Sequence, residues 1–551
     1  MKISIAQLNY HVGNFARNAE LICNAVKKAR QEGSDLVVFS ELSVTGYPPL
    51  DLLDHSDFVK KCAEAVENIA AECTGISAIV GVPVLNTNKE GKKLYNAALV
   101  LSEGKIVFTS KKALLPTYDI FDEYRYFEPE KSFHVFTLGS MKIGITICED
   151  LWDEQPFENE FEKSRLYSVS PIEELVKLNT DFVINISASP FSYSRIETRN
   201  NIFIGKAKKY GRPVIDVNQT GANTELIFHG GSLVVNNAGE VVMQLPYFEE
   251  CMVTFDTGMA FSKQLQALPP RPSDTELIYK ALITGIRDYF GKMNFSKAVV
   301  GLSGGIDSAV VLSLAAKALG SENMKALLLP SRYSSDHSVT DAVRLAENLG
   351  VKYEIISIEK PFSAFEESLS PLFSGLPSDV TEENIQARVR AILLMAYSNK
   401  FGHILLNTSN KSEAAVGYGT LYGDMAGGLS VIGDVYKTDV YRLAEYINLE
   451  EEIIPRNIID KAPSAELRPG QFDTDSLPEY GTLDKILHLY IEMQKPFSEI
   501  IRSGFDRTMV ERVIRMINSN EYKRYQAPPI LRISSKAFGA GRRMPLVAKY
   551  W

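Results

Sequence analysis

The chain has 551 residues, of which 45% are hydrophobic and 23% charged, and its formal net charge is −9. This length is more than one hydrophobic core usually organises, so we expect two domains of roughly 250–300 residues each. No uninterrupted apolar stretch approaches the ~20 residues that span a bilayer, and the acidic balance disfavours contacts with nucleic-acid phosphates, so neither a membrane nor a nucleic-acid partner is expected.

The first residues, Met1 to Ala6, predict a strand and lack the charged segment and long apolar core of a signal peptide. We therefore expect a cytoplasmic protein. Its five cysteines show no CxxC pairing, which indicates reduced thiols and argues against a disulfide framework or a zinc site.

Strand and helix patterns alternate through the N-terminal half. Apolar runs at 36–39, 78–82 and 97–101 indicate strands, and residues 18–30 indicate a helix. This alternation favours an α/β fold.

Three predicted strand ends in this half carry reactive side chains, those of Glu41, Lys112 and Cys148. Each is ordinary by itself, because a lone Glu or Lys in such a place is usually solvated and a lone Cys is most often part of the core. Together they could attack an amide. Glu41 would take the thiol proton of Cys148, the thiolate would form a thioester, and Lys112 would stabilise the oxyanion.

In order and context these residues resemble the Glu-Lys-Cys set of the nitrilase, or carbon–nitrogen hydrolase, superfamily. The resemblance implies an α-β-β-α sandwich. It also implies a glutamine pocket, because the segment from Asn185 to Arg195 is similar to one in glutamine-using members. The implied glutamine-binding residues are Tyr118, Ser189, Arg195 and Glu123, the last of which also resembles the superfamily's supporting second glutamate.

Three prolines in four residues, Pro269, Pro270 and Pro272, mark the expected boundary between the two halves. We expect a glutaminase domain at 1–262, a Pro-rich linker at 263–274 and a second domain at 275–551.

A glycine-rich loop follows the apolar run 298–300 and leads into a predicted helix. Its backbone N–H groups can surround a phosphate at the helix N-terminus. The loop lacks the Lys of a Walker A motif and the GxGxxG spacing of dinucleotide-binding folds, and the alternative is an ordinary Gly-rich turn. It resembles the SGGxDS loop of N-type ATP pyrophosphatases, which implies a Rossmann-like parallel sheet of the adenine nucleotide α-hydrolase type. The implied ATP-binding residues are Gly301, Leu302, Ser303, Gly304, Gly305, Ile306, Asp307, Ser308 and Thr408.

Later segments resemble NAD synthetases, most clearly 407–413 and 417–424, and a hydroxyl-rich loop at 331–338 is suited to fold over phosphates. A helix is expected to open with Thr381 as its N-cap. The basic segment 538–545 is expected to meet an anionic substrate, the alternative being a solvated tail. The implied contacts with deamido-NAD are Asn384, Glu413, Asp424, Lys437 and Lys523, and the implied Mg²⁺ ligands are Asp307 and Glu413.

The resemblance as a whole is to the glutamine-dependent NAD synthetase family. It implies hydrolysis of L-glutamine, passage of ammonia through a sheltered channel, and its reaction with deamido-NAD that ATP has adenylated. It also implies a homo-oligomer of dimeric synthetase units, with an octamer common among bacterial members. Two alternatives stay open, a different glutamine-fed N-type ATP pyrophosphatase and an ammonia-dependent synthetase with a noncatalytic N-terminal module.

Overall fold

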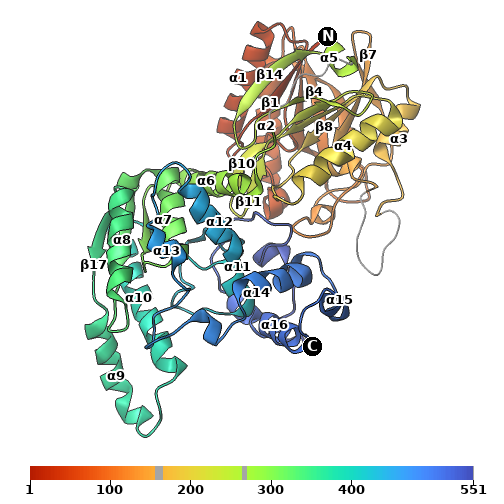
Figure 1. The fold of residues 1–551 in the computed structure, drawn as a ribbon. Helices are drawn as coiled ribbons and strands as arrows, with labels where there is room; N and C mark the ends of the chain where they lie inside the picture. Colours follow the sequence, from red (N-terminus) through yellow and green to blue (C-terminus); the bar gives the residue numbers. More distant parts are fainter. Residues whose placement is uncertain (155–165, 263–269, 550–551) are drawn as a thin grey trace. The chain divides into compact units, whose positions relative to one another are not determined.

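The computed structural model describes residues 1–154, 166–262 and 270–549, and the chain divides into two compact units, Met1–Arg271 and Pro272–Trp551 (Figure 1). The linker expected at 263–274 falls partly on residues 263–269, which lie outside the described residues. No helix in the described part of the chain is long and apolar enough to cross a membrane.

The first unit contains two six-stranded sheets, ordered β14-β1-β2-β3-β4-β5 and β13-β12-β9-β8-β7-β6. The strands of the first sheet are β1 (Lys2–Gln7), β2 (Leu36–Val38), β3 (Ser77–Leu85), β4 (Leu94–Ser102), β5 (Lys105–Lys111) and β14 (Cys251–Asp256). Those of the second are β6 (Val135–Leu138), β7 (Met141–Ile147), β8 (Phe182–Ser187), β9 (Val214–Asn218), β12 (Leu233–Val235) and β13 (Val241–Gln244). A separate ribbon pairs β10 (Thr220–Asn223) with β11 (Leu226–His229).

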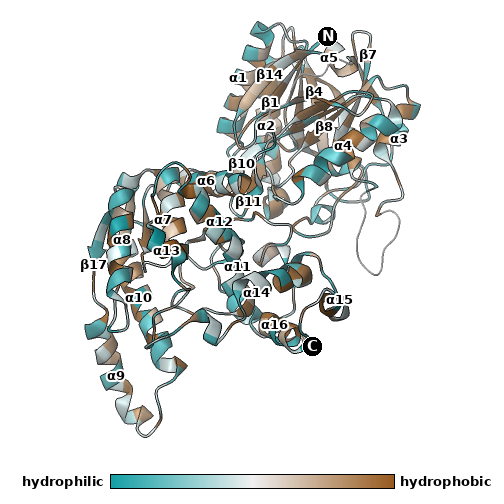
Figure 2. Ribbon diagram, in the orientation of Figure 1, coloured by the Kyte–Doolittle hydropathy of each residue, from teal (hydrophilic) through white to brown (hydrophobic). Residues whose placement is uncertain are grey.

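Side chains alternate between the two faces of each strand, and this alternation produces a four-layer sandwich. Ile3 and Ile5 of β1 lie in the apolar core between the two sheets, whereas Ala6 of the same strand packs with α1 (Phe15–Gln31) and α2 (Ser56–Glu72). On the far face of the second sheet, Phe203 belongs to the core that α3 (Pro171–Lys177) and α4 (Ile196–Tyr210) form with it. The expected α-β-β-α sandwich is confirmed, and Figure 2 shows its strands as mostly hydrophobic.

The second unit is built on a five-stranded parallel sheet ordered β17-β16-β15-β18-β19. The strands are β15 (Ala298–Gly301), β16 (Met324–Leu328), β17 (Lys352–Ile355), β18 (Ile404–Asn407) and β19 (Leu429–Ser430). The chain leaves β15 toward β16 and later returns to its other side at β18, which creates a switch point at the C-terminal ends of β15 and β18. Open parallel sheets bind ligands at such points. The expected Rossmann-like sheet is confirmed.

Helices cover this sheet and extend it into a helical region. Those next to the sheet are α6 (Asp274–Lys292), α7 (Ile306–Leu319), α8 (Asp336–Asn348), α9 (Glu359–Phe373), α10 (Val380–Phe401) and α12 (Lys437–Ile447). The others are α11 (Lys411–Val416), α13 (Arg456–Asp460), α14 (Tyr480–Leu487), α15 (Phe497–Arg502), α16 (Arg507–Ser519) and α17 (Glu521–Arg524). Helices α11, α14 and α16 share an apolar core of their own.

The start of α10 differs from the sequence expectation. Its N-cap is Asp379 and not Thr381, because the Asp379 carboxylate accepts a hydrogen bond from the Thr381 backbone N–H at 2.7 Å. The side chain of Glu382 accepts from the Asp379 N–H at 2.8 Å and completes a capping box. Thr381 therefore already lies inside the helix.

Replacing Phe203 with Ala tests the outer layer of the sandwich. The Phe203→Ala change leaves a cavity between α4 and the second sheet, so we expect the free energy of unfolding to fall by about 3–5 kcal/mol in urea titrations followed by circular dichroism. Asn201→Ala on the exposed face of the same helix is the control and should cost no more than about 0.5 kcal/mol. Equal losses would show that α4 does not depend on this packing.

Candidate active sites

Glu41 and Lys112 meet inside the first unit although they follow different strands. Glu41 comes shortly after β2 and Lys112 directly after β5, and both side chains are fully buried. The Lys112 Nζ donates to Glu41 Oε1 at 2.7 Å, and the Asn96 amide donates to the same oxygen at 2.7 Å. The other carboxylate oxygen accepts from the Ala188 backbone N–H at 3.1 Å. Glu41 and its three donors thereby bring four separate segments of the chain together around one carboxylate.

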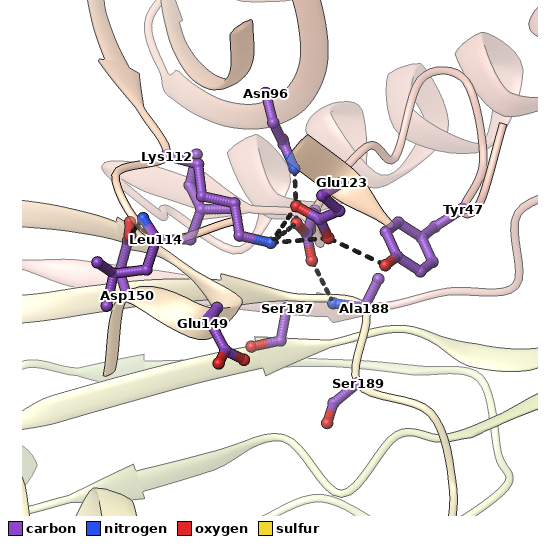
Figure 3. Close-up of polar contacts among 12 residues, drawn as sticks. Tyr47, Asn96, Lys112, Leu114, Glu123, Glu149, Asp150, Ser187, Ala188 and Ser189 are labelled. Carbon is purple, nitrogen blue, oxygen red and sulfur yellow. Dashed lines mark hydrogen bonds and ion pairs between the residues drawn. The ribbon is translucent and has the colours of Figure 1, made fainter. Parts of the chain in front are cut away.

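A second carboxylate shares the same ammonium group. Lys112 Nζ donates to both oxygens of Glu123, at 2.7 and 2.9 Å, and the Tyr47 hydroxyl donates to Glu123 at 3.0 Å (Figure 3). The pKa of Glu123 is raised to about 7, because burial and the Glu41 charge together outweigh the opposing effect of Lys112. Burial by itself would lower the pKa of Lys112, but the two carboxylates hold it well above its usual range. Lys112 therefore stays a cation.

Cys148 follows β7 and opens a short helix, η3 (Cys148–Leu151). Its φ of 46° lies in the left-handed region, which is strained for a residue with a side chain. Burial raises the pKa of the thiol well above its usual value; Glu41 adds to this and Lys112 opposes it. The resting group is thus a thiol, and it needs a base to become a nucleophile.

The residues expected to bind glutamine lie at different distances from this cluster. The Tyr118 hydroxyl donates to Glu149 at 2.9–3.0 Å, and Glu149 is the residue after Cys148. Ser189 follows Ala188, which donates to Glu41. Arg195 is exposed at the N-cap of α4, and within the described residues no hydrogen bond or ion pair joins its side chain to the cluster.

Glu149 was not expected from the sequence. It is buried, it also accepts a hydrogen bond from the Tyr167 hydroxyl at 2.9 Å, and burial raises its pKa to about 8. Its position next to Cys148, the predicted nucleophile, was the available signal, but acidic residues after a strand are common and carry little information singly.

The second unit contains a cavity of about 480 Å³ at the switch point of its sheet. Nearly all the residues predicted for ATP, deamido-NAD and Mg²⁺ line it. They are Gly301, Leu302, Ser303, Gly305, Ile306, Asp307, Ser308, Asn384, Thr408, Glu413, Asp424, Lys437 and Lys523.

Gly304, the remaining predicted ATP-binding residue, explains the shape of the loop. Its φ is 76°, and a Cβ atom there would lie 2.2 Å from the Ser338 carbonyl oxygen at the start of α8. Only glycine fits so close an approach. The next residue, Gly305, is the N-cap of α7, so the loop leads directly into the N-terminus of this helix, where anions are favoured. The Ser308 hydroxyl closes the loop by donating to the Gly305 carbonyl at 3.0 Å.

Two carboxylates and a lysine lie beside this loop. Lys437 Nζ pairs with Asp307, and with Glu413 at 3.3 Å, and Asn410 donates to Asp307 at 2.9 Å while it caps α11. Burial raises the pKa of Glu413 to about 8, and the neighbouring Asp307 charge contributes. The described residues contain no group of three or more His, Cys, Asp or Glu side chains that could hold a metal. Asp307 and Glu413 nevertheless fit Mg²⁺, which commonly takes one or two carboxylates together with substrate phosphates.

The remaining predicted residues hold the segment 417–424. The Asn384 side-chain oxygen accepts from the Thr420 hydroxyl at 2.7 Å, and Asp424 accepts from the Thr420 N–H at 2.7 Å. Lys523 donates to the carbonyls of Gly417 and Gly419, each at 2.8 Å. Burial raises the pKa of Asp424 to about 6 and lowers that of Lys523.

Several charged residues of the cavity were missed or left open by the sequence. Arg390 donates to the Leu329 carbonyl at 3.0 Å, and burial lowers its pKa to about 10. Glu383, Ala387, Arg390 and Leu394 all line the cavity, and their spacing of three or four residues along α10 was a usable signal. Lys461, Glu466 and Asp473 also line the cavity.

Arg542 does not follow the expectation for the basic segment 538–545. It is paired with Glu521, and its guanidinium lies 5.9 Å from the centre of the Phe538 ring. The structure thus gives Arg542 a buried partner within the protein, Glu521.

The chain matches two protein families, and the two matched regions lie in the same order as the two units. Residues 2–261 match the carbon-nitrogen hydrolase family, and residues 278–527 match the NAD synthase family.

Individual proteins are similar along the whole chain. The glutamine-dependent NAD(+) synthetase of Synechocystis sp. is 44% identical over 556 residues, which cover 100% of this chain and 99% of the relative. That of Thermotoga maritima is 40% identical and covers 100% and 99%. A solved structure of the glutamine-dependent NAD+ synthetase from Acinetobacter baumannii, in complex with ADP, aligns with a TM-score of 0.78 at 38% identity and covers 99% of this chain and 98% of that one.

The buried lysine of the first unit gives a stability test. Lys112→Met removes the shared ammonium and leaves Glu41 and Glu123 buried without a counter-charge, so the free energy of unfolding should fall by about 3–5 kcal/mol. The control is Lys177→Met, because Lys177 pairs with Glu173 and Glu174 in an exposed site and should contribute no more than about 1 kcal/mol. Urea unfolding of both variants decides, and a similar small loss in both would contradict the expectation.

Proposed function

Because the chain belongs to the glutamine-dependent NAD(+) synthetases, we infer that its two units divide one reaction between them. The enzyme is a glutamine-hydrolysing NAD synthase. It consumes glutamine, ATP and deamido-NAD and forms NAD⁺, glutamate, AMP and pyrophosphate. The observation that supports this division best is the presence, in one chain, of a buried Glu-Lys-Cys cluster and a separate loop-lined cavity.

In the first unit, Cys148 is proposed as the nucleophile that attacks the side-chain amide of glutamine. Glu41 takes the thiol proton as sulfur bonds to the amide carbon, and Lys112 stabilises the oxyanion that forms. Glu41 then returns the proton to the leaving nitrogen, and ammonia departs. Water attacks the thioester, gives its proton to Glu41 and releases glutamate. Tyr118, Ser189 and Arg195 are proposed to bind glutamine, and the contacts of Glu123 support a role in holding Lys112.

In the second unit, the nicotinate carboxylate of deamido-NAD is proposed to attack the ATP α-phosphate and to expel pyrophosphate. Ammonia then attacks the acyl carbon of the adenylate and AMP leaves. The loop 301–308 and Thr408 are proposed to bind the phosphates, because most residues of the loop and Thr408 line the cavity and the loop leads into the N-terminus of α7. Asn384, Asp424 and Lys523 are proposed to contact deamido-NAD, and their hydrogen bonds to the segment 417–424 support a shared binding surface.

Asp307 and Glu413 are proposed to hold Mg²⁺. When bound, Mg²⁺ neutralises the charge that develops on pyrophosphate. Lys437 pairs with both carboxylates and is therefore placed to contact the same phosphates. Glu413 is proposed to face deamido-NAD as well.

We also propose a homo-oligomer built from dimeric synthetase units, up to an octamer, and a sheltered route for ammonia. Ammonia in bulk water at neutral pH is mostly protonated and no longer a nucleophile. A chain that carries both activities therefore keeps more ammonia in its reactive, unprotonated form if the ammonia passes between the two sites without contact with solvent.

The glutaminase role is tested by Cys148→Ala with amide-¹⁵N-labelled glutamine. We expect glutamine-dependent NAD⁺ synthesis to fall by at least about 1,000-fold, because the nucleophile is lost. Ammonia-dependent synthesis should stay at the wild-type rate. The measurement follows ¹⁵N into NAD⁺ by mass spectrometry and counts AMP and glutamate.

The outcomes separate the open alternatives. Unchanged glutamine use in Cys148→Ala would reject the nucleophile, and glutamate without NAD⁺ or AMP in the wild type would reject deamido-NAD as the acceptor. Ammonia-dependent synthesis alone in the wild type would indicate a noncatalytic first unit.

The Mg²⁺ site predicts a pH dependence. The pKa of Glu413 in the free enzyme is about 8, above its usual value, so this group favours the folded state at low pH and loses that contribution as pH rises through 8. Mg²⁺ requires the ionised form. The rise in melting temperature that Mg²⁺ causes with a non-cleavable α,β-methylene ATP analogue should therefore be larger at pH 9 than at pH 7.

Glu413→Gln supplies the control for the Mg²⁺ prediction. This variant lacks the titrating carboxylate, so the Mg²⁺-dependent rise should be small and similar at both pH values. An equal pH dependence in the variant and the wild type would assign the titration to the nucleotide phosphates and would contradict a role for Glu413.

A further inference from the structure

The carboxylate of Asp150 connects the strand ends that carry Cys148 and Lys112. Its Oδ1 accepts hydrogen bonds from the backbone N–H groups of Ala113 and Leu114, at 3.0 and 2.9 Å. Its Oδ2 accepts from the Ile147 N–H at 3.0 Å. Figure 3 shows Asp150 beside Leu114. The side chain is 3% exposed, so these contacts are shielded from water.

The three donors lie next to the two reacting groups in the chain. Ile147 precedes Cys148, and Ala113 and Leu114 follow Lys112. Asp150 therefore binds the peptide group that directly follows Lys112 and, on the other side, the N–H of Ile147, the residue before Cys148.

No strand pairing joins these two places. β5 is an edge strand of the first sheet, and β7 belongs to the second. Stacked sheets are held about 10 Å apart by apolar side chains, whose attraction has little directionality. A directional link is needed to fix the strand ends, and Asp150 supplies three hydrogen bonds at the site. A second hydrogen bond joins the two strands just before their ends, from the Ser110 hydroxyl to the Ile145 carbonyl at 2.8 Å.

The link also acts on the strained turn at Cys148. The left-handed φ of this residue persists only where its surroundings hold it. Asp150 is two residues ahead, in the same short helix, and binds the N–H of the residue before the turn. The Asp150 side chain thereby holds the turn at Cys148 and also binds the segment that follows Lys112.

We propose that Asp150 is a positioning residue that sets the Cys148 thiol against the Lys112 ammonium by tying the end of β7 to the segment after β5. The proposal deepens the proposed function and rests on Cys148 as the nucleophile. A carboxylate is required, because three N–H groups need acceptors on both oxygens. An asparagine offers only one oxygen and turns an NH₂ group toward a donor.

The test compares Asp150→Asn with Asp181→Asn in the full chain. Asp181 also accepts a backbone hydrogen bond, from Lys142 N–H at 2.7 Å, but at the opposite end of β7. Each variant loses one charge and an acceptor for a backbone N–H group of β7. The readouts are the pH profile of Cys148 alkylation by iodoacetamide, kcat and KM for glutamine, and ammonia-dependent NAD⁺ synthesis.

We expect Asp150→Asn to lower kcat of glutamine hydrolysis about 100-fold, because a displacement of about 1 Å at reacting groups costs that much. KM should change less than about threefold. The alkylation profile should shift, and ammonia-dependent synthesis should not change. Asp150→Glu restores both acceptor oxygens on a longer side chain and should recover part of the loss. Asp181→Asn should behave as the wild type.

Two results would overturn the proposal. One is a wild-type alkylation profile and kcat in Asp150→Asn, and the other is equal losses in Asp150→Asn and Asp181→Asn. If Asp150→Asn does not fold, the alkylation profile of Asp150→Glu decides. The longer side chain must move the two strand ends relative to each other, so a profile equal to that of the wild type rejects the proposal. A wrong nucleophile assignment is detected by a separate measurement on the wild type. If glutamine does not protect Cys148 from alkylation, the assignment of Cys148 as the nucleophile fails, whatever the Asp150 variants show.

Discussion

A buried ammonium group shared by two carboxylates is the constraint on which this molecule depends. Lys112 holds Glu41 and Glu123 in the first unit, and Lys437 holds Asp307 and Glu413 in the second. Removing such charges from water costs several kcal/mol for each ion, and the cost is recovered only when the partners stay in contact. The segments that carry them must therefore converge, and each convergence makes a reactive site.

The two folds make this convergence possible in different ways. The sandwich buries the ends of strands from both of its sheets, so that Glu41 and Lys112 approach from the first sheet and Cys148 from the second. The parallel sheet instead collects loops at one switch point, where the loop 301–308 and the segment after β18 face the same cavity. The resulting division suits the two reactions. Amide attack needs a few buried groups in fixed places, whereas two nucleotides need room and many hydrogen-bond donors.

The residues that the sequence predicted were those that a short stretch of neighbouring residues is enough to identify. Gly304 and its neighbours are constrained by one turn, and Glu41, Lys112 and Cys148 each follow a strand. The pattern could not show which groups are buried together. Ala188 and Glu41, for example, are 147 residues apart, and Lys437 and Asp307 are 130 residues apart. Glu149 and Arg390 were missed or left open because an acid after a strand and an arginine on a helix are most often solvated.

The sequence by itself predicted two α/β domains, because helix and strand periods are local, and it proposed Glu41, Lys112, Cys148 and the loop 301–308 as site residues, because residue types in fixed order are read along the chain. Tertiary structure alone decided that Arg542 pairs with Glu521 and that Asp150 joins two sheets. Hydrogen-bond and ion-pair partners are chosen by burial and by distance in space. Neither quantity can be read from neighbours along the chain.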